Sequence, residues 1–430
     1  MPAATLVSRD MRPLLLECSK GFPAVAVVGP RQSGKSSLVR LAFPKHRVAV
    51  LESPDVAAEA RRDPRRFLMS FANERGAILD EVQRVPELFS YLLEFIDQNP
   101  APGQWILTGS ESLLLSEKLS QTLAGRVVTL ELLPMTQDEL GRFPKRRGAR
   151  ATTLNDAIFS GGYPPIFARK LDPSLWIDSY LSTYVERDVR NVLRLGDLST
   201  FQRFLGLCAG RTSQLINAAS LAADTGISQP TAKAWLSVLE ATFIIKLLPA
   251  WHGNIRKRLV KAPKLHFVDT GLACYLLGLR SADQLNTHAS RGALFESWAV
   301  SEVMKAQSNA GERSRLFHWR DQNGAEVDLV VDRGGVLTAI EMKSGVTFQE
   351  EWLRGVKRFA AALPKSVQVQ SVVCSGADPN HKTSKRLSTV TRSPRAGIDG
   401  ERVSWSDLSP FAAALFAKPK KTKPPRARTR

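Results

Sequence analysis

The sequence lacks the features of disulfide-rich secreted proteins and of membrane-spanning proteins. Its 430 residues include only four cysteines, Cys18, Cys208, Cys274 and Cys374, which lie far apart and form no CxxC pair. This spacing argues against a zinc site and against a disulfide framework, and it suits a reducing compartment. No apolar run approaches the roughly 18 residues needed to cross a bilayer. We therefore expect a cytoplasmic protein without a membrane segment.

Acidic residues are scarce relative to basic ones. The chain has 41 Asp and Glu against 60 Lys and Arg, which gives a formal net charge of +19. Such an excess indicates a polyanionic partner, with nucleic acid favoured over an anionic membrane surface. Residues 418–430 form a basic, low-complexity tail with no acid, but the rest of the chain is basic without it. We therefore expect DNA as a partner, and we predict that the tail is disordered.

The length predicts two or three domains, because single hydrophobic cores stop growing below 430 residues. Residues 1–145 alternate strand-like runs with helical stretches, which is typical of α/β domains with a parallel sheet. Residues 146–280 are mainly helical, and residues 281–417 mix helix and strand again. The expected strands of the first region are 24–28, 47–51, 77–79, 105–108 and 127–130.

Residues 29–36 read GPRQSGKS and complete the phosphate-loop pattern GxxxxGK[ST]. In this pattern the glycines let backbone N–H groups face the phosphates, Lys35 neutralises them, and the Ser36 hydroxyl ligates Mg²⁺. A buried strand before the loop and a helix after it give the expected context. The sequence therefore predicts a site for ATP and Mg²⁺. The residues expected to bind nucleotide are Gly29, Pro30, Arg31, Gln32, Ser33, Gly34, Lys35, Ser36 and Ser37.

Three later segments supply candidate partners for this loop. The apolar run 77–79 ends in Asp80 and Glu81, which we expect to join the Mg²⁺ shell and to orient or activate water, respectively. Thr108 ends the next strand and could sense the γ-phosphate, although it could equally be an ordinary turn hydroxyl. Arg126 could act as an arginine finger, although a solvated surface arginine is an equal alternative.

The segments GPRQSGKSSLV, ILDEVQRVPEL, WILTGS and TLAGRVVTLELLPMT together resemble the AAA-type ATPases of a bacterial and archaeal family. That family carries a C-terminal domain long described as of unknown function. The resemblance extends through GGYPP, YVERDV and HFVDTGL, so it covers nearly the whole chain. It implies an AAA-like P-loop NTPase domain at residues 1–145.

The middle region contains a candidate helix-turn-helix at residues 215–240, with a turn at 226–228 and Ser228 as the N-cap of the second helix. A following apolar strand could form a wing. The helix would expose a DNA-reading end, although similar units also serve as lids or protein-contact modules. A basic run follows it, for which a solvated loop is the alternative. The candidate DNA-binding residues are Gln229, Thr231, Lys233, Arg256, Lys257 and Arg258.

In the third region, EVDLVVDRGGVLTAIEMKSG predicts a hairpin that turns at 334–335 and places Asp328 opposite Glu341. Alternation of side chains then puts Asp328, Glu341 and Lys343 on one face, and the other face carries Val327, Leu329, Ile340 and Met342. Two carboxylates and a lysine suit a Mg²⁺-dependent phosphodiesterase. The arrangement resembles the PD-(D/E)xK nucleases, in which a residue at the position of Glu296 is a further metal ligand.

The resemblance implies a restriction-endonuclease-like α/β domain at residues 281–417, although Val327 replaces the usual proline before Asp328. An exposed strand face with cross-strand ion pairs is the alternative. The leading hypothesis is an ATPase that remodels or moves along DNA and carries a metal-dependent nuclease domain. The rivals are a nucleotide-switched regulator with an inactive nuclease-like domain, and a regulator whose helix-turn-helix docks protein. Arg126 acting on a neighbour's nucleotide would require a dimer or a ring.

Overall fold

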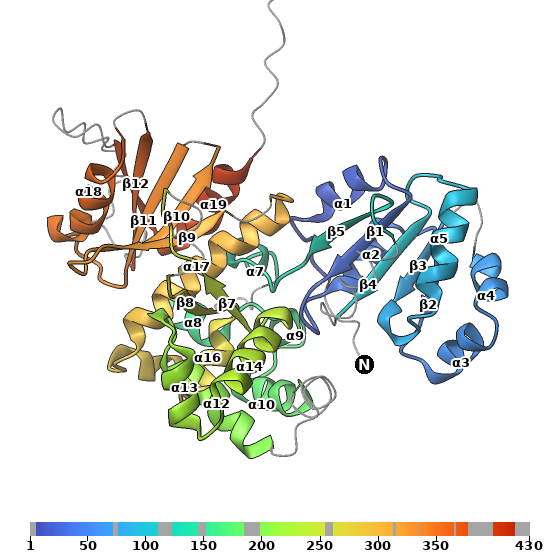
Figure 1. The fold of residues 1–430 in the computed structure, drawn as a ribbon, viewed down its shortest axis with the longest axis horizontal. Helices are drawn as coiled ribbons and strands as arrows, with labels where there is room; N and C mark the ends of the chain where they lie inside the picture. Colours follow the sequence, from blue (N-terminus) through green and yellow to red (C-terminus); the bar gives the residue numbers. More distant parts are fainter. Residues whose placement is uncertain are drawn as a thin grey trace, which may run out of the picture.

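The computed structural model describes residues 6–71, 76–110, 123–144, 152–184, 198–253, 261–312, 315–334, 336–364, 367–376 and 399–417. Its elements form an α/β lobe, a mainly helical unit and a second sheet (Figure 1). The predicted basic tail, the basic run 256–258 and the hairpin residue Gly335 lie outside the described residues. Within the described part of the chain, no helix is both long enough and apolar enough to span a bilayer.

The N-terminal lobe is built on a parallel sheet in the order β2-β3-β4-β1-β5. Its strands are β1 (Ala24–Val28), β2 (Arg47–Val50), β3 (Ala77–Asp80), β4 (Trp105–Gly109) and β5 (Val127–Glu131). Its helices are α1 (Arg12–Cys18), α2 (Lys35–Ala42), α3 (Pro54–Arg62), α4 (Pro64–Phe71), α5 (Leu88–Gln98) and α7 (Gln137–Leu140). All five strands lie at the expected positions, with ends that differ by at most one residue.

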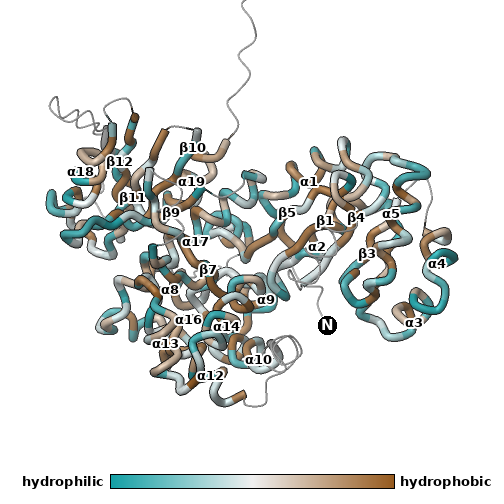
Figure 2. The backbone as a smooth tube through the Cα atoms, in the orientation of Figure 1, coloured by the Kyte–Doolittle hydropathy of each residue, from teal (hydrophilic) through white to brown (hydrophobic). Residues whose placement is uncertain are grey.

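Helices cover both faces of this sheet, and its central strands are therefore buried throughout. Val25 and Val27 of β1 pack in the cluster that contains α1 and α2, while Ala24 and Ala26 pack in the cluster that contains α3, α4 and α5. Strands buried on two faces appear in sequence as continuous apolar runs. Figure 2 shows this concentration of hydrophobic residues along the strands of the lobe.

The middle unit is mainly helical and includes a small antiparallel sheet in the order β6-β8-β7. Its helices are α8 (Leu154–Ser160), α9 (Pro164–Ala168), α10 (Pro173–Tyr184), α12 (Leu198–Gly210), α13 (Ala218–Thr225), α14 (Gln229–Ala241) and α16 (Thr270–Leu276). Its strands are β6 (Gln214–Leu215), β7 (Ile245–Leu248) and β8 (Lys264–Phe267).

The C-terminal unit is a mixed sheet in the order β13-β12-β11-β10-β9. Its strands are β9 (Leu316–Arg320), β10 (Glu326–Arg333), β11 (Val336–Lys343), β12 (Gln368–Ser375) and β13 (Asp399–Ser404). Its helices are α17 (Arg291–Asn309), α18 (Arg354–Ala361) and α19 (Leu408–Phe416). Strand β10 pairs antiparallel with β9 and with β11, and strand β12 pairs parallel with β11 and with β13.

Helix α17 joins the middle and C-terminal units. It lies between the C-terminal sheet and the middle helices (Figure 1), and most of its side chains are buried. One hydrophobic cluster runs from Leu154 in α8 through Trp298 in α17 to Phe416 in α19. The two units therefore share a continuous core across the boundary expected at residue 280.

Candidate functional site

The loop between β1 and α2 has the backbone shape that phosphate binding requires. Gly29 has a φ of 150°, and a Cβ at this position would lie 2.2 Å from the carbonyl oxygen of Leu132. Only glycine fits there. Gly34 has a φ of 96° and is the N-cap of α2, so the helix N-terminus opens directly from the loop.

Lys35 is buried and its ammonium folds back on the loop. Its Nζ donates to the carbonyl oxygens of Gly29 at 3.0 Å and Pro30 at 2.8 Å. Phosphate oxygens are stronger acceptors than these carbonyls because they are charged. The loop therefore presents a lysine that can transfer its hydrogen bonds to a phosphate.

Three hard oxygen ligands meet beside the loop, at the carboxyl ends of β3 and β4 and in the first turn of α2. Asp80 Oδ1 accepts from Ser36 Oγ at 2.7 Å and from Thr108 Oγ1 at 2.5 Å. Asp80 Oδ2 accepts from Arg40 at 3.1 Å. A hydroxyl and a carboxylate in contact are the donor set that Mg²⁺ prefers in phosphate sites, so these residues fit the ion.

Glu81 lies next to this group with a left-handed backbone, at a φ of 58°. Its Oε2 accepts from Gln83 Nε2 at 2.6 Å and from Ser110 Oγ at 2.9 Å. Burial would raise the pKa of Glu81, but the charge of Lys35 and the bonds from Gln83 and Ser110 lower it on balance. Glu81 is therefore held as a carboxylate in a fixed orientation. Gln83 lies in the segment ILDEVQRVPEL, but its role could not be assigned from the sequence.

Arg126 lies at the end of the sheet where the strands begin, opposite to the end that carries the phosphate loop. It directly precedes β5, whose first residue pairs with Ala24 at the amino end of β1, whereas the loop follows the carboxyl end of β1. Its side chain is half exposed and forms an ion pair with Asp97 at 2.5 Å. Within one chain, Arg126 therefore does not reach the phosphate loop across the length of β1.

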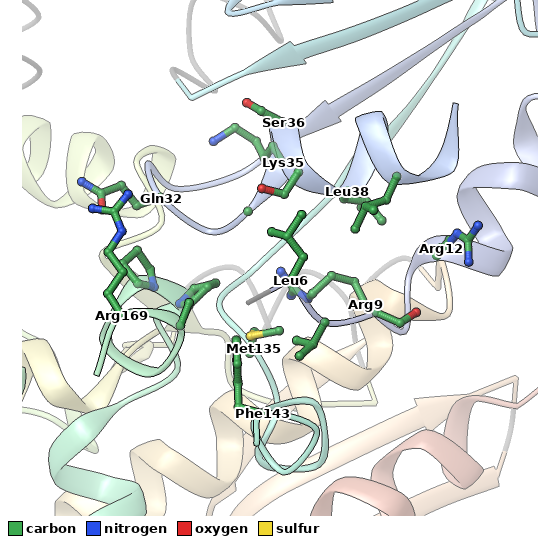
Figure 3. Close-up of a pocket in the computed structure, with 18 of the residues that line it drawn as sticks. Leu6, Arg9, Arg12, Gln32, Lys35, Ser36, Leu38, Met135, Phe143 and Arg169 are labelled. Carbon is green, nitrogen blue, oxygen red and sulfur yellow. The ribbon is translucent and has the colours of Figure 1, made fainter. Parts of the chain in front are cut away.

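A cavity of about 650 Å³ opens beside the loop, between the N-terminal lobe and α9 (Figure 3). Its polar lining includes Lys35, Ser36, Gln32 and three arginines that the sequence analysis missed, Arg9, Arg12 and Arg169. Figure 3 shows Arg169 beside Gln32. The apolar part is formed by Leu6, Leu41, Met135, Phe143, Pro164 and Pro165. The middle unit thus supplies one wall of the site.

A smaller cavity of about 250 Å³ also borders the loop. Arg31, Gln32 and Glu81 line it from the N-terminal lobe, and Tyr180 and Thr183 line it from α10. The phosphate loop is therefore flanked by two helices of the middle unit, α9 and α10.

Arg9 ties the phosphate loop to the helix α7. Its guanidinium donates to the Ser33 carbonyl at 2.6 Å, to the Leu133 carbonyl at 2.8 Å and to Glu139 at 2.9 Å. Glu139 is fully buried. Burial would raise its pKa, but the Arg9 charge and bond, with backbone bonds from Asp10 and Thr136, lower it on balance. This buried pair holds the loop and α7 together.

The same polar contacts continue from α7 into the C-terminal unit. Glu302 on α17 accepts from the backbone N–H of Gln137 at 2.8 Å and from the hydroxyl of Ser409 in α19. Lys305, one turn further along α17, donates to Glu302 at 2.9 Å and to the Met135 carbonyl at 3.0 Å. Hydrogen bonds therefore connect the phosphate loop to α17 and α19.

The expected helix pair is present as α13 and α14, joined by a turn in which Gly226 has a φ of 81°. Ser228 accepts from the Thr231 N–H at 3.2 Å and is the N-cap of α14, as predicted. Gln229 and Lys233 are exposed and Thr231 is half buried. Arg256, Lys257 and Arg258 lie outside the described residues, in the connection between β7 and β8.

The hairpin forms in the expected register. Leu329 pairs with Ile340 and Arg333 with Val336, which places Asp328 opposite Glu341. The prediction for Val327 is wrong, because Val327 packs with Val330 against α18 and not with Leu329 and Ile340. The cause is a register shift between β10 and β9 at residues 327–330, which breaks the alternation of side chains.

Carboxylates gather at this hairpin and on α17. Glu296, Glu326 and Asp328 have oxygens within 4.8 Å of one another. Glu341 Oε1 binds Lys343 Nζ at 2.6 Å. Burial and the nearby Asp328 charge raise the pKa of both Glu296 and Glu341. The predicted residues Glu296, Asp328, Glu341 and Lys343 thus lie in one neighbourhood.

A lysine that the sequence indicated only as part of the basic stretch after residue 258 occupies the centre of this cluster. Lys264, the first residue of β8, is almost fully buried. Its Nζ lies 2.6 Å from Glu296 Oε1 and 3.5 Å from Asp328 Oδ1, and it also contacts Glu326. Three carboxylates that could hold a metal ion thus bind an ammonium. As folded, the cluster does not fit a divalent ion.

Family profiles match three segments of the chain. A profile described as an AAA domain matches residues 21–141. Two domains of unknown function, DUF8612 and DUF4143, match residues 151–283 and 291–392. Uncharacterised proteins of Mycobacterium tuberculosis and Mycobacterium bovis are each 30% identical over 339 residues, which is 78% of this chain and 73% of theirs.

Solved structures with some likeness include a Walker-type ATPase of Pyrococcus abyssi. It is 18% identical, with a TM-score of 0.45, covering 62% of this chain and 94% of that one. A Holliday junction branch migration motor of Thermotoga maritima is also 18% identical, with a TM-score of 0.30, covering 55% of this chain and 87% of that one.

Proposed function

This chain belongs to a family of AAA-type P-loop ATPases whose AAA domain is followed by a DUF4143 domain, and we propose that its Mg²⁺-dependent ATP hydrolysis acts on DNA. The observation that best supports ATP hydrolysis is the contact of Ser36, Asp80 and Thr108 beside the phosphate loop. Glu81, fixed as a carboxylate by Gln83 and Ser110, stands next to them.

Each of these residues has a defined task in the proposed reaction. The Lys35 ammonium exchanges the loop carbonyls for phosphate oxygens, and Glu81 accepts a proton from the attacking water or orients it. A Mg²⁺ ion held by Ser36 and Asp80 would neutralise charge on the phosphates. The apolar wall near Met135 and Phe143 suits the adenine base.

The proposal of DNA as partner rests on charge and on the helix pair. The net charge of +19 favours phosphate backbones. Gln229 and Lys233 are exposed at the start of α14, where a recognition helix would contact DNA. The basic residues 256–258 follow in the β7–β8 connection. The nucleotide cycle would then remodel DNA or move the protein along it.

Measuring ATP turnover with and without DNA tests this proposal. Single-stranded, duplex and branched DNA should each be compared with no DNA, at low and at physiological salt, because phosphate contacts weaken steeply with salt. We expect at least one form of DNA to stimulate turnover. Lys35→Ala should abolish turnover under all conditions and serves as the control for a contaminating ATPase. Turnover that none of the three DNA forms changes would refute the DNA-acting role while leaving the ATPase assignment intact.

A second candidate is a nucleotide-switched regulator in which ATP changes partner affinity or oligomeric state. The contacts that run from Ser33 through Arg9 and Glu139 to Glu302 favour it, because they couple the loop to α17. In α14, Lys233 is the only basic residue, which suits a protein contact as well as a DNA contact.

Size determination with and without a non-hydrolysable ATP analogue distinguishes this candidate. A nucleotide-dependent change in mass, with DNA-independent turnover, would favour the regulator. Arg126 could then act on the nucleotide of a neighbouring copy. Arg126→Ala should in that case lower turnover only under conditions in which the protein assembles.

Metal-dependent cutting would require Glu296, Asp328 and Glu341 to be available to a divalent ion. Lys264 binds two of these three carboxylates. We therefore do not propose nuclease activity for the chain as folded.

A further inference from the structure

Lys264 is an unusual cation for a cluster of acidic side chains, because it comes from a different unit of the fold. It begins β8 in the small middle sheet, whereas Glu326 and Asp328 belong to β10 of the C-terminal sheet and Glu296 to α17. An exposed lysine would gain little from such contacts. This one is only 3% exposed, so its charge depends on the three carboxylates around it.

The geometry matches that of a bound cation. An ammonium has three N–H donors, and Lys264 meets three carboxylates. A buried ammonium is stable when its charge is paired, and these three carboxylates supply the paired charge. A divalent ion at the same carboxylates would lie within a few ångströms of the ammonium, where like charges repel strongly.

We infer that Lys264 is the resident cation of this acidic cluster and that a divalent metal ion can enter only where Lys264 is absent or displaced. The Lys264 ammonium therefore occupies the position among these carboxylates that a metal ion would otherwise take. Glu341 is bound separately by Lys343, whose side chain is 38% exposed, so Lys264 is the buried member of the two lysines.

Backbone contacts hold Lys264 in this position. The residues after β7 pair with β9, since the Trp251 N–H donates to the His318 carbonyl at 2.6 Å and the His318 N–H donates to the Pro249 carbonyl at 3.0 Å. Because β7 and β8 pair with each other, these bonds also fix β8 beside the C-terminal sheet. Withdrawal of Lys264 would require this edge to separate.

Mn²⁺ binding to the nucleotide-free full-length protein tests the inference. It can be measured by the electron paramagnetic resonance signal of free Mn²⁺ and by calorimetry. The binding assigned to the cluster is the part that Asp328→Asn abolishes, which separates it from binding at Ser36 and Asp80. We expect no such binding in the wild type. Lys264→Ala should create it, which corresponds to a gain of at least about 10-fold in Asp328-dependent affinity over the limit set by the wild-type titration, because a repelling charge has been removed.

Two further variants keep the test decisive. Lys264→Met retains the apolar stem and removes the charge, which guards against a folding failure of Lys264→Ala. Lys246→Ala is the matched control, because Lys246 lies on the neighbouring strand β7 and forms a partly exposed pair with Glu240 at 2.8 Å. It should create no Mn²⁺ binding. Far-ultraviolet circular dichroism of each variant establishes that it is folded.

Two results would overturn the inference. One is Asp328-dependent Mn²⁺ binding by the wild type, which would mean that Lys264 does not exclude the ion. The other is a folded Lys264→Ala or Lys264→Met protein that binds no more Mn²⁺ than the wild type. If neither variant folds, the wild-type titration alone decides. None of these outcomes depends on ATP turnover, so the inference can fail while the ATPase proposal stands.

Discussion

Replacing Arg9 by methionine should destabilise the N-terminal lobe severely, although Arg9 belongs to no recognised motif. The side chain of Arg9 is 5% exposed and that of Glu139 is fully buried. Loss of Arg9 leaves Glu139 as an uncompensated buried charge and removes donors to the Ser33 and Leu133 carbonyls. Breaking a buried pair in this way costs about 3–5 kcal/mol. For a lobe of this size we expect a decrease in Tm on the order of 10 °C.

The cost of Arg9→Met should depend on pH in a defined direction. In the wild type the pKa of Glu139 lies below its usual value, so its stabilising contribution is present near neutral pH and is lost as the pH falls. Without Arg9, burial raises that pKa, and the stability of the variant falls as the pH rises through it. The difference in Tm between wild type and variant should therefore be largest near pH 7 and smaller near pH 4.

Calorimetric unfolding at several pH values measures this effect. The double variant Arg9→Met with Glu139→Gln should recover part of the lost stability, because no charge remains buried. Arg12→Met is the control, since Arg12 is a neighbouring but exposed arginine. A cost of Arg9→Met below about 1 kcal/mol, comparable to that of a surface pair, would refute the reasoning.

Three further outcomes are expected. Glu81→Gln should retain ATP binding but lower kcat by about 100-fold or more, measured by calorimetric titration and steady-state turnover; unchanged kcat would exclude Glu81 as the base. Burial lowers the pKa of His318 to about 4, so folding loses up to about 3 kcal/mol from this group as the pH falls from 6.5 towards 4, and His318→Gln should flatten the profile of Tm against pH. Deletion of residues 418–430 should weaken DNA binding and reduce its salt dependence; identical slopes would show that the tail takes no part.

The sequence predicted the elements of the N-terminal lobe because their signals are local. Each parallel strand is a continuous apolar run, and the phosphate loop has a fixed spacing within one strand-loop-helix unit. The hairpin register could also be predicted, because the Gly334 turn determines which residues of two adjacent strands face each other. Ser228 could be identified as an N-cap by the same kind of short-range reasoning.

The rest of the candidate site could not be predicted from local pattern. Arg9 meets Glu139 across 130 positions of the chain, and Lys264 meets Glu296 across 32. Nothing in the residues next to Arg9 or Lys264 distinguishes them from surface cations. The shift at Val327 is determined by pairing with β9, and no pattern within β10 indicates it. Such contacts depend on how whole elements pack.

Helix α17 carries two sets of polar contacts, and their spacing limits how this helix can change during evolution. Glu296 meets Lys264, while Glu302 and Lys305 meet the N-terminal lobe. One inserted residue between Glu296 and Glu302 would rotate one group by about 100° relative to the other and displace it by about 1.5 Å along the axis. Either contact would then be lost. We expect homologous chains to vary in length in the loops around α17 while the spacing between these two positions stays constant.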